Sequence, residues 1–203
     1  MRSVGQLDAE LLQTLERDFR EVAERAGEWL ACRPGCSECC HGPFPITRLD
    51  VERLRRGLAQ LSERKPLRAE AVVARARMTR ERLSDGFPGD EAKGRLDGDE
   101  RALDEYFKWH DSLACPVLDP VSGCCELYDA RPVSCRNYGP PQRFDDVDSA
   151  ACRLCFGGAD EKTVESCRLL PDPDGLEQAI LAGMGVAPGE EWETLIAFAV
   201  GYL

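Results

Sequence analysis

Hydrophobic residues near the start of the chain recur every three or four positions. They are Leu11, Leu12, Leu15, Phe19, Val22 and Trp29. Because an α-helix completes a turn every 3.6 residues, this spacing predicts one amphipathic helix from about Leu7 to Leu30. Residues 1–31 are therefore expected to form an N-terminal amphipathic helix, which leads directly into a group of four cysteines.

Three more helices are predicted between this cysteine group and residue 110. Thr47 followed by Asp50 is typical of a helix N-terminus, and a stripe of leucines continues from it at Leu49, Leu54, Leu58 and Leu61. A second, cationic helix is expected from about Pro66 to Leu83, and a short one over Glu100–Trp109. The stretch Ser84–Gly98 contains four glycines and is expected to be a loop.

The last third of the chain is rich in helix breakers. Between Cys115 and Pro141, proline and glycine leave room only for short strands and turns, whereas Gly175–Leu203 predicts two short helices. The fold class is therefore expected to be mainly α, as a small single domain with few short strands and an irregular, loop-rich cysteine region. Three segments are expected: the helix of 1–31, a cysteine domain over 32–157 with a helical insertion at about 47–110, and helices over 158–203 that pack on the same domain.

Composition adds a chemical signal, since the 203 residues include 11 Cys but only 2 His. An odd number of cysteines with two adjacent pairs, Cys39-Cys40 and Cys124-Cys125, suits a disulfide framework poorly. The N-terminus lacks the apolar run of a secretion signal, and no stretch approaches the roughly 18–20 apolar residues of a membrane span. We therefore expect a cytoplasmic protein without a membrane segment, whose reduced thiols bind metal.

The charge distribution bears on possible partners. A formal net charge of -11 argues against nucleic acid, because phosphate binding needs a clustered positive surface. The region 47–83 departs from this acidic balance. It contains Arg48, Arg53, Arg55, Arg56, Arg64, Lys65, Arg68, Arg75, Arg77, Arg80 and Arg82. This basic helical face is either a solvated surface with ion pairs or a docking face for an acidic protein partner.

The first cysteine group contains Cys32, Cys36, Cys39 and Cys40 within nine residues. Cysteines separated by two residues can point both sulfurs at one metal ion from a tight turn. The adjacent Cys39 and Cys40 cannot readily share one tetrahedral ion. They are therefore expected to reach different ions, unless one of them is a neighbouring or reactive thiol. His41 follows directly and is a candidate ligand or proton carrier.

The second cysteine group makes the pattern recognisable. Cys115-Pro116-Val-Leu118 is followed by Cys125-Glu-Leu-Tyr128 and by Arg131-Pro132-Val-Ser-Cys135-Arg136. Together with Cys36, Cys39 and Cys40, these elements resemble in order the zinc- or iron-chelating CxxCxxCC domain of the YkgJ-like cysteine cluster family. Three departures from the family pattern are the wider spacing between Cys32 and Cys36, Ser37 in place of the usual glycine, and the additional Cys124.

The resemblance implies a bound zinc ion, iron ion or iron–sulfur cluster. A set of thiolates suits either zinc or an iron–sulfur cluster, and the scarcity of histidine disfavours mixed sites. The expected metal ligands are Cys32, Cys36, Cys39, Cys40, Cys115, Cys125 and Cys135, with Cys152 and Cys155 as a third group that could complete a site. These exceed the four ligands of one ion. Either two centres share the thiols, or one cluster leaves some of them free.

Other polar residues have simpler expected roles. Cys167 is expected to be a buried core residue, and His110 a packing or surface residue. Arg131 and Arg136 would either offset the charge of a thiolate centre or form ion pairs with acidic residues. The sequence predicts no catalytic residues and no other cofactor-binding residues.

Three functions remain open at this point. The first is metal binding itself. The second, implied by the resemblance, is an iron–sulfur oxidoreductase or a methyl-transfer enzyme related to flagellin lysine methylase; the third is a metal-handling or partner-docking module. The spacing Cys32-x3-Cys36-x2-Cys39 also occurs in radical SAM enzymes, but Glu38 stands where they have an aromatic residue, and strand signals are few.

Overall fold

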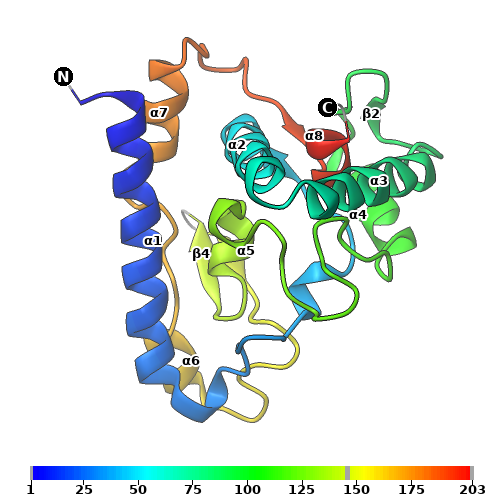
Figure 1. The fold of residues 1–203 in the computed structure, drawn as a ribbon. Coiled ribbons are helices and arrows are strands. Elements are labelled where there is room, and N and C mark those ends of the chain that lie inside the picture. Colours follow the sequence, from blue (N-terminus) through cyan, green and yellow to red (C-terminus); the bar gives the residue numbers. More distant parts are fainter. Residues whose placement is uncertain (1, 145–146, 202–203) are drawn as a thin grey trace. The chain divides into compact units, whose positions relative to one another are not determined.

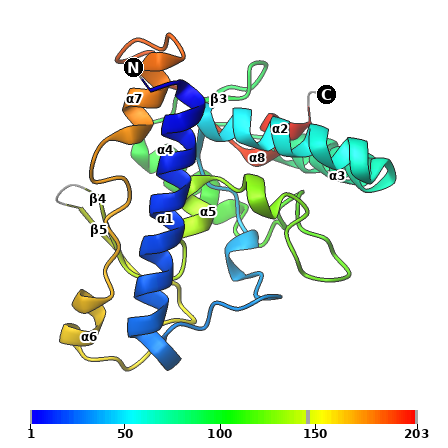
Figure 2. The ribbon, with the colours of Figure 1, turned by 60° about the vertical axis from the view of Figure 1, so that its left-hand side comes forward.

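The computed structural model describes residues 2–144 and 147–201 (Figures 1 and 2). These residues form eight α-helices and three pairs of short antiparallel strands, so the predicted mainly α fold class is confirmed. Their contacts divide the chain into two compact units. The N-terminal unit combines the residues up to Cys36 with Val133–Glu190, and the central unit combines Ser37–Pro132 with the residues from Glu191 onward. The predicted segments 1–31, 32–157 and 158–203 stay a prediction.

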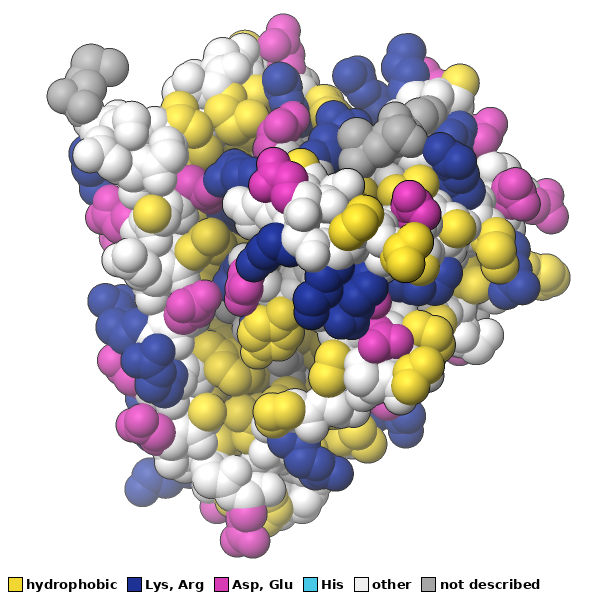
Figure 3. Space-filling model, viewed as in Figure 1, with side chains coloured by type: hydrophobic (Ala, Val, Ile, Leu, Met, Phe, Trp, Pro, Cys, Tyr) yellow, Lys and Arg dark blue, Asp and Glu magenta, His cyan; other side chains and the backbone are white. Residues whose placement is uncertain are grey.

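The N-terminal unit is built on the long helix α1, Val4–Ala26. Its first turn is closed by a capping box, in which Ser3 and Gln6 each accept a hydrogen bond from the other's backbone amide. Of the predicted apolar stripe, Leu11, Leu15 and Val22 are buried and Leu12, Phe19 and Trp29 are half-buried. Lys and Arg are interspersed with Asp and Glu over the exposed face of α1, at the left of Figure 3. Helices α7 (Leu176–Gly183) and α5 (Val133–Asn137) pack against α1 (Figure 1).

Past the end of α1, the turn Gly27–Trp29 leads toward the first cysteines. The same unit contains the strand pair β4 (Gln142–Phe144) and β5 (Val147–Ser149), and helix α6 (Glu161–Ser166). One apolar cluster of this unit contains Val22, Ala26, Cys152, Cys155, Phe156, Cys167 and Leu169. Cysteines therefore contribute three of the seven buried residues in this cluster.

The central unit is built on two consecutive helices, α2 (Arg48–Arg64) and α3 (Pro66–Leu83). The predicted cap is present, because the amide of Asp50 donates to Oγ1 of Thr47 at 3.4 Å and the Asp50 carboxylate accepts from the Thr47 amide. The predicted leucine stripe of α2 is buried. Helix α8 (Ile196–Val200) packs against both helices and completes the core of this unit (Figure 2).

Short elements complete the central unit. Strand β1 (Ile46–Thr47) pairs with β6 (Glu193–Thr194), and α4 spans Glu100–Trp109, as predicted. Within the predicted loop 84–98, β2 (Gly89–Asp90) pairs with β3 (Arg95–Leu96). The prediction of a loop missed this hairpin because two-residue strands are too short to show an alternating pattern. Among the described residues, no helix is long and apolar enough to cross a membrane.

Candidate thiolate metal centre

Backbone hydrogen bonds bring the two cysteine groups of the central unit together. The amide of Cys115 donates to the carbonyl oxygen of Cys40 at 2.7 Å, and the amide of Gly42 donates to Leu113 at 2.9 Å. An isolated antiparallel bridge between His41 and Ala114 lies between these two bonds. The segment that follows the 3₁₀ turn η2 (Glu38–Cys40) is thereby fixed beside Cys115.

A second set of hydrogen bonds places Cys125 beside the segment that carries Cys115. The amide of Glu126 donates to Val117 at 2.8 Å, and the amide of Asp119 donates to Cys124 at 2.9 Å. Gly123 has a φ of 67°, in the left-handed region that glycine adopts without strain, so the chain can reverse at this point. The segments that carry Cys115 and Cys125 therefore form a small antiparallel loop.

The segments joined by these hydrogen bonds carry four thiols, Cys39, Cys40, Cys115 and Cys125, which we call the central thiols. The Cys40 thiol donates a hydrogen bond to the Cys39 sulfur, which lowers the pKa of Cys39 to about 7 and raises that of Cys40. Negative charge on Cys39, Cys115 or Cys125 opposes ionisation of Cys40 as well. The four sulfurs thus lie within electrostatic range of one another.

Backbone amides point at the sulfurs of the two more deeply buried central thiols. Burial raises the pKa of Cys115 to about 12 and also raises the pKa of Cys125. Against this, the amides of Val117 and Leu118 donate to the Cys115 sulfur, and the amide of Leu127 donates to the Cys125 sulfur. Such donors favour the thiolate over the thiol. These hydrogen bonds therefore offset part of the cost of ionising the two thiols, although burial keeps both pKa values raised.

Arginine side chains also act on the central thiols. The positive charge of Arg131 lowers the pKa of both Cys39 and Cys125, although other effects on these thiols are larger. Its Nε donates to the Tyr128 carbonyl at 2.9 Å, and its guanidinium lies 3.6 Å from the centre of the Tyr128 ring. Arg131 thus offsets thiolate charge, which is one of the two predicted alternatives. Arg136 follows the second alternative, an ion pair with an acidic residue. It pairs with Glu16 in the N-terminal unit at 2.9 Å.

Helix α3 supports the loop that carries Cys115 and Cys125. Arg75 donates to the Pro116 carbonyl at 2.9 Å, and its guanidinium lies 3.9 Å from the carboxylate of Glu126. Arg68 pairs with the same carboxylate at 2.8 Å, and the Glu126 side chain is only 5% exposed. The residues after both cysteines are therefore held by arginines of the predicted basic face.

Other arginines of the predicted basic face also have partners within the central unit. Arg53 is buried and pairs with Asp50 at 2.9 Å, whereas Arg80 lies 3.9 Å from Glu91. Ion pairs are therefore present at both positions, but Arg53 is buried and does not belong to the solvated helix surface that was expected. A protein partner for the remaining basic residues of 47–83 stays a prediction.

The N-terminal unit gathers a separate set of cysteines, Cys32, Cys36, Cys152 and Cys155, which we call the N-terminal thiols. The Cys32 thiol lies 3.8 Å from the Tyr138 carbonyl and shares a hydrogen bond with Cys155. Burial raises the pKa of Cys32 to about 12, and negative charge on Cys155, Cys36 and Cys152 adds to this effect. Cys36 and Cys152 therefore lie within electrostatic range of Cys32.

The remaining cysteines lie in different settings. Cys135 is a partly buried residue of α5 in the N-terminal unit, and its predicted role as a ligand stays a prediction. Cys167 is completely buried in the apolar core of the same unit, as predicted. Cys124 is exposed on the loop of the central unit, where its sulfur lies 3.7 Å from the Ser122 carbonyl.

The two histidines lie in the central unit. His41 is exposed, and its Nδ1 lies 3.0 Å from the Ser37 carbonyl. His110 packs against the Tyr106 ring, with the ring centres 4.7 Å apart, which confirms the prediction of a packing residue.

Within 2–144 and 147–201, no group of three or more His, Cys, Asp or Glu side chains is arranged to hold a metal ion. Tetrahedral zinc with bonds of about 2.3 Å would need sulfurs roughly 3.8 Å apart. The donor chemistry of both sets fits zinc or iron, but the side chains must rotate from their mutual hydrogen bonds to close around an ion.

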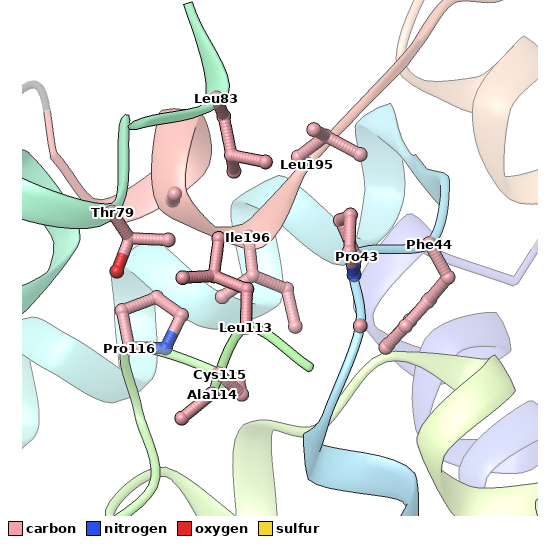
Figure 4. A pocket seen from close by; sticks show the side chains of 12 residues that line it. Pro43, Phe44, Thr79, Leu83, Leu113, Ala114, Cys115, Pro116, Leu195 and Ile196 are labelled. Atoms are coloured by element: carbon pink, nitrogen blue, oxygen red, sulfur yellow. The ribbon is translucent and has the colours of Figure 1, made fainter. Parts of the chain in front are cut away.

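An apolar cavity of about 20 Å³ adjoins Cys115 (Figure 4). It is lined mainly by side chains such as Phe44, Leu83, Leu113 and Ile196. A cavity of this volume accommodates about one water molecule. It therefore gives the buried side of Cys115 an apolar surrounding and does not offer space for an organic substrate.

Comparison with known proteins identifies the family. Residues 31–155, more than half of the chain, match the CxxCxxCC family, which is described as a putative zinc- or iron-chelating domain. The chain belongs to this family, and the predicted resemblance is confirmed. The matched range includes all of the central thiols and all of the N-terminal thiols. No curated protein and no solved structure matches the chain.

Proposed function

We propose that the protein binds zinc or iron through the central thiols, Cys39, Cys40, Cys115 and Cys125. The observation that carries this proposal is that backbone hydrogen bonds join the segments of these four cysteines, where hydrogen bonds from Val117, Leu118 and Leu127 also favour the thiolate forms of Cys115 and Cys125. Buried thiols do not need such donors, because a neutral thiol behaves as a small apolar group. Thiolates do need them, and metal binding is the chemistry that turns buried thiols into thiolates.

Electrostatics supports a cation at this position. Ionising several neighbouring thiols without a cation is costly, since each negative charge opposes the next in a partly buried setting. A divalent ion removes this cost, while Arg131 offsets part of the remaining negative charge. When bound, such an ion supplies a covalent-like cross-link between the two loops that carry the ligands.

The adjacent pair Cys39-Cys40 limits how the central thiols can share one or two ions. Neighbouring residues cannot readily direct both sulfurs at one tetrahedral ion, so two arrangements are consistent with the sequence. In a centre with two irons or two zinc ions, each cysteine of the pair binds a different ion. In a centre with one ion, either Cys39 or Cys40 stays outside the ligand set. Single variants C39S and C40S separate these cases, because only a two-ion centre loses metal in both.

A double variant tests the proposed ligands directly. We expect C115S/C125S to lose the metal of the central thiols after anaerobic expression, measured by elemental analysis alongside acid-labile sulfide. The matched control is C124S, which removes the exposed neighbouring thiol on the same loop and should keep its metal. Equal metal content in the double variant and in the control would contradict the proposed ligand set.

The finer functional alternatives remain separate questions. We expect the protein to act in the cytoplasm, where thiols stay reduced and available to metal. The family resemblance also implies an iron–sulfur oxidoreductase or a methyl-transfer enzyme, but none of the described residues points to a substrate for either. Metal binding is therefore the function that the described residues support best.

A further inference from the structure

The N-terminal thiols come from segments far apart in sequence that backbone hydrogen bonds join within one unit. The amide of Phe156, next to Cys155, donates to the Trp29 carbonyl at 2.8 Å. The amide of Cys152 donates to Gly139 at 3.0 Å. The turn after α1, the segment around Gly139 and the Cys152–Cys155 segment are therefore tied together at the positions that carry the thiols.

Gly139 leaves room for the sulfur of Cys32. A Cβ atom added to Gly139 would lie 2.6 Å from the Cys32 sulfur, which is closer than real Cβ contacts come. Its φ of 131° also favours glycine over other residues. Because the Cys152 amide binds the carbonyl of this same glycine, Cys32 and Cys152 are both positioned by one residue.

Two tight turns position the sulfurs of Cys155 and Cys36. The amide of Cys155 donates to the Cys152 carbonyl at 2.7 Å, and this turn carries two cysteines at the spacing that metal-binding knuckles use. The amide of Cys36 donates to the Arg33 carbonyl at 2.9 Å, which folds Cys36 back beside Cys32. Cys32 and Cys155, one from each turn, share a hydrogen bond.

The N-terminal thiols differ from one another in exposure. Cys152 and Cys155 are 5% and 6% exposed within the apolar cluster, whereas Cys36 is half-buried and Cys32 is exposed. The set therefore has an apolar floor and an open side through which an ion can enter. Cys167, in the same cluster, is completely buried.

We propose that Cys32, Cys36, Cys152 and Cys155 form a second metal site, independent of the central thiols, which takes one zinc or ferrous ion. Each thiol would release its proton to solvent on binding, so that four sulfur–metal bonds replace four S–H bonds without any change of oxidation state. The ion would cross-link the end of α1 to the Cys152–Cys155 turn. A closed set of four thiolates is typical of a structural site.

Thiol reactivity in the unmodified protein tests this proposal without any substitution. The metal-loaded chain is treated with N-ethylmaleimide under native conditions, and the modified cysteines are identified by mass spectrometry with time. We expect Cys32 and Cys36, the accessible members of the set, to react at least tenfold more slowly than the exposed Cys124 until a strong chelator is added. Reaction of Cys32 and Cys36 as fast as Cys124 in the metal-loaded chain would overturn the proposal.

Metal stoichiometry in variants separates this site from the central one. We expect C152S/C155S to lose one ion per chain and to retain the metal of the central thiols, whereas C115S/C125S should do the reverse. If C152S/C155S does not fold, as judged by circular dichroism, G139A provides the second variant, because its Cβ displaces the Cys32 sulfur and removes no ligand. Unchanged metal content in whichever of these variants folds would overturn the second site, whatever happens at the central thiols.

Discussion

The backbone amide of Cys115 donates a hydrogen bond of 2.7 Å to the carbonyl oxygen of Cys40, so one cysteine of the second group is fixed directly against the first group. This bond does not depend on either sulfur. It brings the ligand segments together through the backbone and leaves the side chains to close around an ion. The central unit is therefore organised for metal binding before the sulfur–metal bonds form.

Arg75 is predicted to position the metal ligands without binding metal. It donates to the Pro116 carbonyl at 2.9 Å and faces Glu126, so it holds the residues that follow Cys115 and Cys125. We expect R75A to lower the free energy of unfolding by about 1–3 kcal/mol, the cost of losing a partly buried hydrogen bond from a charged group. Metal should also be lost to a chelator at least several-fold faster. R82A, an exposed arginine of the same helix, is the control, and equal chelation rates in the two variants would refute this role.

The buried ion pair at the start of α2 is predicted to be a major source of stability in the central unit. Asp50 and Arg53 pair at 2.9 Å with side chains 2% and 3% exposed. Removing the carboxylate charge in D50N leaves the buried guanidinium without this partner, which we expect to cost roughly 3–5 kcal/mol in urea unfolding. The control is D90N, which breaks the exposed pair with Lys93 and should cause no comparable loss. Similar midpoints for both variants would contradict the prediction.

An exposed group of charges in the N-terminal unit predicts a dependence on pH. Arg168 lowers the pKa of Glu165 and Arg143 lowers the pKa of Asp148, chiefly through hydrogen bonds to the carboxylates. Because these pKa values are lower in the folded state, the pairs stabilise it at neutral pH, and this contribution disappears as the carboxylates are protonated. The R143Q variant should melt below the unmodified protein at pH 7, and the difference should shrink below about pH 4. A difference in melting temperature that stays constant with pH would count against this assignment.

The rate of metal exchange separates a structural role from metal handling. Closed thiolate sites hold their ion while the protein stays folded, because all ligands must be displaced. We therefore expect loss of metal to a competing chelator over hours at neutral pH, together with a fall in melting temperature when the metal is removed. Complete exchange within minutes, with no change in melting temperature, would instead support a metal-handling module.

Local features of the fold could be predicted from the sequence, and long-range ones could not. Thr47 with Asp50, and Pro66 at the start of α3, are signals carried by residues close in sequence, so both helix starts were predicted. The bond from Cys115 to Cys40 joins two backbones and leaves no mark on side-chain patterns. For the same reason, the sequence could not show that the boundary between the units falls between Cys36 and Ser37, inside one cysteine group.

For the candidate site, too, the sequence predicted local features and not long-range contacts. The sequence predicted the cysteines of the family pattern and Cys152 with Cys155 as candidate ligands, because their spacing carries the signal. It could not suggest the two proposed sets, since these depend on Gly139 and on the loop that pairs Leu118 with Cys125. Similarly, charge along α3 did not reveal that Arg68 and Arg75 share Glu126 as a partner.

The metal content of the unmodified chain tests the central claim most directly. The full-length protein is purified without oxygen, and zinc, iron and acid-labile sulfide are measured per folded chain. We expect stoichiometric metal, with at least one ion at the central thiols and one more at the N-terminal thiols. A folded chain that contains neither zinc nor iron, and that takes up neither when they are supplied, would contradict this expectation.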